Sequence, residues 1–335
     1  MAKNSKGNFK QSEIIPERIL TFKEIIDRLH NVPLPPRAVI PLSYTRINTL
    51  LSCPYKFLMQ YCTKIDKVTK RRLKSDANIA GTIVHNVFET YLAYLAASEN
   101  KNPKDFDLCW VDAKKMYELK EGAITTTAEE LLETFREGTE RCVQKAENLI
   151  IKNNLRPLNE FKFTVGNSFN FTKQTSYPMN DPFFFYGAAD LLLFNDDHSQ
   201  ALVIDWKTYS RSKDKIEDES NNLQLDMYKY FMYKWFNILY GTKSVDVAIA
   251  YVPDSEIVRL HAPINKDNEQ QLSERTRLEL TKYTLAAEKF AEDFRTKSVK
   301  KTPYKGCRWC DFNLLCKKGH DFGLRYEFKK EGFTI

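Results

Sequence analysis

The residues whose types and spacing could do chemistry are Asp190, Asp205 and Lys207, which lie in two apolar stretches joined by the turn-forming segment 195–199. This pattern predicts a β-hairpin in which the two aspartates converge on one cation. Carboxylate oxygens are the ligands that Mg²⁺ and Mn²⁺ prefer, and the backbone carbonyl of Trp206 could add another. Lys207 shares a strand face with Asp205, so its ammonium could orient an attacking water or stabilise charge on a phosphate. Together they indicate metal-assisted hydrolysis.

A plainer interpretation exists for the same residues. Asp-x-Lys occurs by chance in any Lys-rich chain, and both aspartates could be solvated residues at strand ends. Val203 and Ile204 stand directly before Asp205, which indicates a buried strand. A buried strand that ends in charged residues carries a desolvation cost, and this cost favours a functional reason for them.

Two predicted helices carry further polar residues. The segment from Ile79 to Leu95 has apolar residues at helical spacing on one broad face, with His85 at the margin of that face. By spacing alone, a histidine at the edge of a core explains His85 better than a metal ligand does. A later helix, from Asn222 to about Leu239, carries Gln224 and Tyr228 four residues apart and therefore on one face. They could contact phosphates, although Tyr228 could also be a plain buried tyrosine.

Four cysteines form a second set of candidate ligands. Cys307, Cys310 and Cys316 have the spacing Cys-x2-Cys-x5-Cys, and Cys53 lies at a predicted helix junction far upstream. Four thiolates suit either zinc or an iron-sulfur cluster, and the spacing alone favours zinc. The chain has seven cysteines and no secretory feature, so a disulfide framework is a poor explanation. Cys62 is the alternative fourth ligand.

The combination of Gly-x-x-Asp190, a hairpin and Asp205-x-Lys-Thr resembles the core of the RecB-like PD-(D/E)xK nucleases, which include AddB-type and CRISPR-associated members. The segment from Gly81 to Glu89 is similar to the Gly-Thr-x-x-His-x-x-x-Glu element of these families, and Gln224-x-x-x-Tyr228 is similar to their later helix. Ala189 stands where a proline gives the superfamily its first letter, a change that many RecB-like members share. The likeness covers scattered elements from about residue 42 to residue 316.

The resemblance implies a set of roles around a divalent ion. Asp190, Asp205 and His85 would hold Mg²⁺ or Mn²⁺, and Lys207 would position the attacking water. Glu160, directly before the first predicted strand, resembles an acidic position that supports the lysine or a second metal. Gln224 and Tyr228 match the later helix of these families, and a Gln and a Tyr so aligned could hydrogen-bond phosphates or line the substrate groove.

The resemblance also bears on the cysteines. Cys53 begins a Cys-Pro-x-x-Phe segment similar to one that precedes these nucleases, whose four cysteines hold a four-iron four-sulfur cluster. It therefore implies such a cluster on Cys53, Cys307, Cys310 and Cys316, with zinc as the second choice. Either centre would close a loop of about 250 residues and so restrict the unfolded chain.

The order of predicted elements indicates an α/β fold. Apolar spacing is helical up to about residue 155, and beyond Arg156 it alternates, as in strands. We expect a restriction-endonuclease-like mixed β-sheet core flanked by helices, with a large N-terminal helical portion and a C-terminal cysteine-cluster segment. The predicted boundaries are a tail and connector at 1–40, a helical region at 41–155, the nuclease core at 156–265 and a helix with the cysteine segment at 266–335.

Composition limits the partners. The chain has 51 Lys and Arg against 44 Asp and Glu, a formal charge of +7 that favours a polyanion. It shows no apolar span of membrane length and no secretory leader, so we expect a cytoplasmic protein, which a phage could encode, with no membrane partner. No phosphate-cradling Gly-x-x-x-x-Gly-Lys-Ser/Thr occurs, so any helicase would be a separate chain.

These observations predict an exonuclease acting on DNA that is single-stranded or has free ends. Recombination or repair, phage DNA processing and CRISPR adaptation are each compatible settings, and RNA is not excluded as a substrate. One alternative is a catalytically silent iron-sulfur module that binds DNA beside a partner helicase or nuclease. Another is an adaptor whose cysteine site docks a partner.

Overall fold

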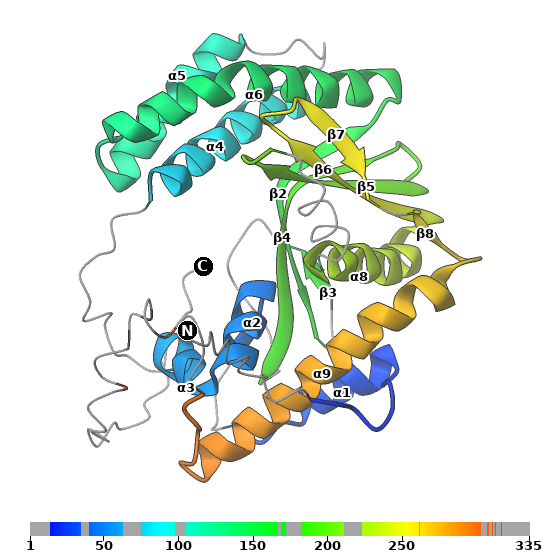
Figure 1. Cartoon of the computed structure of the whole chain (residues 1–335). Coiled ribbons are helices and arrows are strands. Elements are labelled where there is room, and N and C mark those ends of the chain that lie inside the picture. The colour runs from blue at the N-terminus through cyan, green and yellow to red at the C-terminus, as the bar shows by residue number, and fades with distance from the viewer. Residues whose placement is uncertain are drawn as a thin grey trace, which may run out of the picture. The chain divides into compact units, whose positions relative to one another are not determined.

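The computed structural model describes residues 14–34, 40–62, 75–97, 105–166, 169–171, 182–210, 223–260 and 262–302, with residues 307, 310, 312 and 316 (Figure 1). Most of the predicted tail, part of the Pro-rich connector and most of the segment after residue 302 therefore lie outside the described residues. The chain divides into two compact units, one from residues 1–72, 163–187 and 274–335 and the other from residues 73–162 and 188–273.

Helices dominate the first half of the chain and strands follow, as predicted. The helices are α1 (Phe22–His30), α2 (Tyr44–Ser52), α3 (Pro54–Phe57), the π-helix η1 (Leu58–Cys62), α4 (Asp76–Ala97), α5 (Phe106–Glu121), α6 (Thr126–Lys152), α8 (Leu223–Tyr240) and α9 (Glu269–Arg295). The strands are β1 (Ile40–Leu42), β2 (Arg156–Val165), β3 (Phe169–Phe171), β4 (Phe183–Phe194), β5 (Gln200–Lys207), β6 (Ser244–Tyr251), β7 (Glu256–Arg259) and β8 (Ile264–Asn265). None of the helices within the described ranges is both long and apolar enough to cross a membrane.

The strands form a mixed sheet with the order β3-β2-β4-β5-β6-β7, and β1 and β8 pair with β4 and β6. The predicted hairpin is present, because β4 and β5 pair antiparallel with Leu191 opposite Ile204 and Phe194 opposite Ala201. β5 then pairs with β6 in parallel, and the connection between them contains α8. A parallel pair needs such a crossover, whereas a hairpin needs only a tight turn.

Two layers of helices cover the sheet of the second unit (Figure 1). Leu191, Ile204 and Trp206 belong to a buried cluster with residues of α4, α5 and α6, while the alternate residue Phe194 packs edge-on against Phe236 of α8 at 4.9 Å. Successive side chains of a strand point to opposite faces, so the alternation sends one set to each helical layer. The mixed α/β class predicted from the sequence is thus observed.

In the first unit, α1 is tied to α9. Thr21 caps α1 in a capping box with Glu24. Arg28 donates two hydrogen bonds to Glu288 at 2.7 and 2.8 Å, and Leu20 N donates to Thr281 Oγ1 at 3.0 Å. Bidentate pairing of this kind fixes orientation as well as contact.

Two details differ from the sequence-based expectation. β2 begins at Arg156 instead of Phe161, so Glu160 lies within a strand and not before it. The short strands β1, β3, β7 and β8 were not predicted, because two to four residues give too little alternation to recognise.

Gly138 sets the distance between α6 and the end of β6. A Cβ atom built at Gly138 would lie 1.9 Å from the carbonyl oxygen of Val252. In an ordinary helix interior Gly→Ala stabilises by about 0.5–1 kcal/mol. We expect Gly138→Ala to have the opposite sign and to lower the free energy of unfolding by about 2 kcal/mol or more, measured by urea denaturation. Glu133→Ala, an exposed change on the same helix, should alter it by less than about 0.5 kcal/mol. A neutral or stabilising Gly138→Ala would contradict this packing.

Candidate active site

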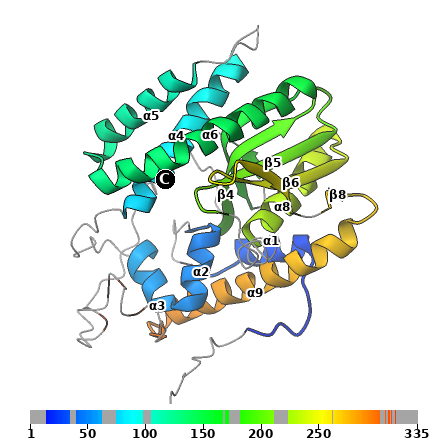
Figure 2. The same cartoon turned by 45° about the horizontal axis from the view of Figure 1, so that its top comes forward.

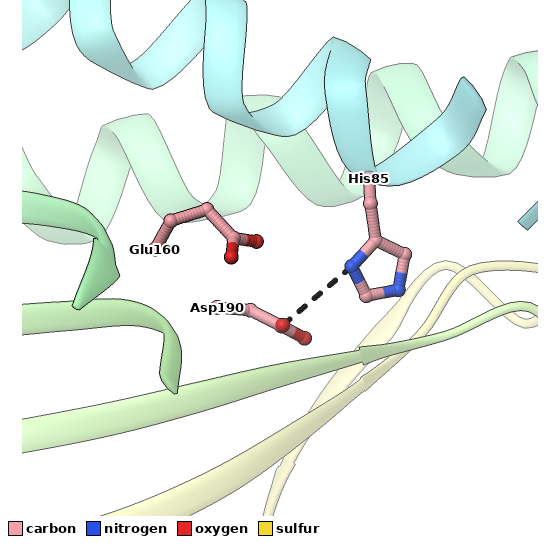
Figure 3. Close-up of side chains that lie close together, drawn as sticks. All are labelled: His85, Glu160 and Asp190. Atoms are coloured by element: carbon pink, nitrogen blue, oxygen red, sulfur yellow. Dashed lines mark ion pairs between the residues drawn. The ribbon is translucent and has the colours of Figure 1, made fainter. Parts of the chain in front are cut away.

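Side chains from α4, β2 and β4 meet within the second unit. His85, Glu160 and Asp190 each offer a ligand atom, and these atoms lie within 4.8 Å of one another (Figure 3). All three side chains are half-buried. An imidazole and two carboxylates gathered in this way form a plausible donor set for a divalent cation.

Asp190 is held from two sides. Its Oδ2 accepts a hydrogen bond from the backbone N of Trp206 at 2.8 Å, and its Oδ1 lies 3.5 Å from His85 Nδ1 (Figure 3). The Trp206 ring stacks on Phe88 of α4, with ring centroids 3.9 Å apart and planes 4° from parallel. Since His85 and Phe88 lie about one helical turn apart, this stack also fixes how α4 presents His85.

Glu160 occupies a strained place in β2. Its φ is +47°, in the left-handed region that residues with a side chain seldom adopt, and such strain gathers at functional sites. The neighbouring Asn159 was not predicted as a site residue, yet its Nδ2 donates to the carbonyl oxygen of Glu89 at 3.1 Å and so ties β2 to α4. Its position directly before Glu160 is the one signal in the sequence that could have identified it.

Asp205 and Lys207 stand beside this group on β5. Lys207 Nζ lies 2.7 Å from Asp205 Oδ2, and Asp205 is only 7% exposed. Asp205 lies outside the set of three mutually close ligands. The structure therefore brings His85, Glu160 and Asp190 together and adds the ion pair of buried Asp205 and half-buried Lys207 next to them.

Buried negative charge dominates the electrostatics. Burial, followed by the charge of Asp190, raises the pKa of Asp205 to about 6, although Lys207 and His85 act in the opposite direction. Burial also raises the pKa of Glu160, and the charge of Asp190 adds to this rise. Both carboxyls are therefore buried beside another carboxylate, and the nearby cations offset this only in part.

The pKa of His85 also reflects the excess of negative charge in the site. Burial lowers the pKa of His85, but the hydrogen bond and charge of Asp190, with the charges of Asp205 and Glu160, raise it above its usual value on balance. The carboxylates of Asp190, Asp205, Glu160 and Glu89 thus outnumber the cations that act on them, which are Lys207, Lys162 and the imidazole of His85. A bound divalent cation would balance this charge, so the residues fit the ion that the sequence predicts.

The predicted substrate residues support the site from α8. Tyr228 is 6% exposed, and its hydroxyl accepts hydrogen bonds from Gln224 Nε2 at 2.9 Å and from the backbone N of Ala188 at 3.4 Å. Burial raises the pKa of the Tyr228 hydroxyl. Tyr228 therefore holds the strand that carries Asp190, and Gln224 is half-buried beside it.

The candidate cluster ligands lie in the first unit. Cys53 ends α2 and caps α3, where its Sγ accepts a hydrogen bond from Lys56 N at 3.4 Å. Burial raises the pKa of Cys316, and the charges of Cys53, Cys307 and Cys310 raise it further. These effects place the other three thiols in the surroundings of Cys316, although among the described residues no three of the four sulfurs lie within 4.8 Å of one another.

Two other side chains complete the surroundings of the cysteines. The charge of Lys301 opposes the rise in the pKa of Cys316, and Lys301 Nζ donates a hydrogen bond to the carbonyl oxygen of Cys316 at 3.2 Å. Burial raises the pKa of the Cys62 thiol, the charge of Arg46 opposes this rise, and no other cysteine contributes to it. Cys53 is therefore better placed than Cys62 to complete a set of four.

A family model described as the PD-(D/E)XK nuclease superfamily matches residues 41–317, a range that contains all of these residues. This chain belongs to the PD-(D/E)XK nuclease superfamily. No curated protein matches it. Among the solved structures that match is one described as the crystal structure of SSO0001, with 17% identity, coverage of 72% of this chain and 97% of that chain, and a TM-score of 0.27. A likeness this distant carries no argument.

Membership in the PD-(D/E)XK superfamily implies a hydrolase that cuts nucleic acid, with DNA as the substrate class. The mixed sheet flanked by helices agrees with the restriction-endonuclease-like fold predicted for the chain, so that prediction is confirmed. Nucleases of this superfamily typically use Mg²⁺ or Mn²⁺, and His85, Glu160 and Asp190 offer an acidic site for such an ion.

The raised pKa of Asp205 makes stability depend on pH. Its folded value is about 6, and an unfolded aspartate titrates near 3.9. A carboxyl whose pKa rises on folding contributes stability below the unfolded value and loses it as the pH rises through the folded value. In metal-free protein, the free energy of unfolding of Asp205→Asn relative to the wild type should therefore increase by on the order of 1–3 kcal/mol between pH 4 and pH 7.

Urea denaturation across this pH range, with a chelator present, measures the effect. Mn²⁺ at pH 7 should then stabilise the wild type more than the variant, since the ion compensates the buried carboxylates. A difference between variant and wild type that stays constant with pH would contradict the assigned environment of Asp205.

Proposed function

We propose that this chain is a RecB-like, metal-dependent deoxyribonuclease that works as an exonuclease on DNA that is single-stranded or has free ends. The observation that carries the proposal is the gathering of His85, Glu160 and Asp190 beside the ion pair of Asp205 and Lys207. Helix α4, strand β2 and the hairpin of β4 and β5 deliver these groups to one place. A structural core does not need such a concentration of acids.

Each residue has a role in the proposed reaction. Asp190, His85 and Asp205, with Glu160 and the carbonyl oxygen of Trp206 as further donors, would hold Mg²⁺ or Mn²⁺. When bound, the ion would supply positive charge to the phosphate and lower the pKa of the attacking water. Lys207 is held at 2.7 Å by Asp205, so its ammonium is positioned to orient water or to stabilise charge on the phosphate.

The substrate and partners follow from chemistry and charge. A formal charge of +7 favours a polyanion. Because the sequence carries no phosphate-cradling ATPase motif, unwinding would fall to a helicase or recombination partner in trans. Recombination or repair, phage DNA processing and CRISPR adaptation are the settings in which such an activity would act.

Lys207→Ala tests the mechanism. We expect the cleavage rate of labelled linear DNA in Mn²⁺ to fall at least about a hundredfold, because a preorganised charge near the phosphate is lost. Binding of Mn²⁺, measured by isothermal titration calorimetry, should persist because the ligand set is kept. Lys243→Ala, which removes an exposed lysine of the same unit, should cleave like the wild type.

Substrate topology tests the preference for ends. Single-stranded and double-stranded linear DNA should be degraded, whereas covalently closed circles should persist.

Equal cleavage by wild type and Lys207→Ala would overturn the mechanism. DNA binding without cleavage by either protein would establish the silent binding module instead.

We also propose that Cys53, Cys307, Cys310 and Cys316 hold a four-iron four-sulfur cluster. The effect of the other three thiols on Cys316 and the capping position of Cys53 support this ligand set. The cluster would join the segment around Cys53 to the C-terminal segment and so restrict the unfolded chain, a structural contribution that needs no redox step.

Cys316→Ser tests the cluster. Protein purified without oxygen should be brown and contain iron, and the variant should lose both the chromophore and most of the iron. Cys62→Ser is the matched control and should keep both. Stoichiometric zinc with no visible absorbance would overturn the iron-sulfur proposal in favour of a zinc site.

A further inference from the structure

Helix α5 exposes an apolar face. Leu108 is 56% exposed, Val111 45%, Met116 37% and Leu119 87%. The buried side chains of α5, which are Cys109, Trp110, Ala113 and Tyr117, belong to the other side of the helix. Figure 2 shows α5 at the outer edge of the helical layer formed with α4 and α6.

The period of the helix explains this separation. At about 3.6 residues per turn, Leu108, Val111 and Leu119 fall on one side, and Met116 lies at its margin. The outer side of a surface helix is ordinarily polar, so large apolar side chains gathered there mark an interaction surface. Within the part of the chain that the structure describes, this surface remains exposed.

The residues of this face are arranged symmetrically along α5. Leu108 and Leu119, Val111 and Met116, and Asp112 and Lys115 form three pairs, each centred on the peptide bond between Ala113 and Lys114. A two-fold axis that runs beside this helix, level with that peptide bond and perpendicular to the helix, would place the two members of each pair opposite one another, one from each copy. An antiparallel second copy of α5 would then set leucine against leucine, valine against methionine and aspartate against lysine.

We propose that this face of α5 is a self-association surface on which two copies of the chain pair their α5 helices antiparallel. Two-fold pairing uses the same patch on both subunits and requires it to be self-complementary. The apolar pairs supply burial, and the pairing of Asp112 with Lys115 of the second copy fixes orientation and register. The face fits another copy better than it fits DNA, since Lys115 is the one cation within it and large apolar side chains surround it.

The size of the helix sets the strength of the dimer. A helix of 16 residues is about 24 Å long at ~1.5 Å per residue, so one helix pair buries less than a standard stable interface. We expect a reversible dimer with a dissociation constant on the order of micromolar. The inference is independent of the nuclease proposal, because it concerns a helix outside the candidate active site.

Sedimentation velocity from about 1 to 200 µM tests the surface. The wild type should shift from monomer to dimer over this range. Leu108→Glu should raise the dissociation constant at least tenfold, since it places a charge against the apolar side chain of Leu119 of the second copy. Ile238→Glu is the matched control, because Ile238 is 70% exposed on α8 of the same unit and should leave association unchanged.

Charge exchange tests the register. Asp112→Lys and Lys115→Asp should each weaken the dimer severalfold, and the double variant should restore it. Because these residues also lie three apart on one helix, melting temperatures of all variants must be compared. An effect within one helix would appear in the melting temperature of dilute monomer, not in the association constant.

A wild type that stays monomeric throughout the concentration range would overturn the proposal. A dimer that Leu108→Glu leaves intact would overturn it as well. Failure of the double charge exchange to restore association would overturn the antiparallel register. Cleavage of DNA is measured separately and decides none of these outcomes.

Discussion

The carboxylate of Asp190 is the contact on which the candidate active site depends. It accepts a hydrogen bond from the backbone of β5 and faces the imidazole presented by α4, so one side chain joins a strand, its hairpin partner and a helix. Tyr228 holds the same strand from α8 through the backbone of Ala188. A short carboxylate fixed from both sides loses rotamer freedom before any ligand arrives, which is the preorganisation that a metal site requires.

This arrangement has an electrostatic cost. Asp205 is almost fully buried, and the charge of Asp190 adds to the burial that raises its pKa. Lys207 compensates part of this charge, and the raised pKa values of Glu160 and His85 show that a surplus remains. A fold selected for stability alone would have apolar residues at these positions. The excess negative charge is better explained by a cation that binds at this site.

The sequence predicts the parts of this site that depend on local pattern. The hairpin followed from turn residues between two apolar stretches, and the helix of His85 from one apolar face. The position of Glu160 inside β2 could not be predicted, because no residue type in the sequence indicates a left-handed backbone conformation within a strand. The i,i+4 spacing of Gln224 and Tyr228 predicts that they share a helix face, but it does not predict which residues that face contacts. The structure buries Tyr228 against the strand of Asp190.

Helix α5 shows the same limit in a different form. Apolar residues occur on both of its sides, so Leu108 and Trp110 carry equal weight in a pattern of hydrophobic spacing. Only the packing separates them, since Trp110 is buried with α4 and α6 whereas Leu108 stays exposed. Exposed apolar surface of this kind costs solubility unless a partner covers it. The symmetry of the exposed residues about the middle of the helix therefore carries information that hydrophobic periodicity does not, because it is a property of how two copies would meet.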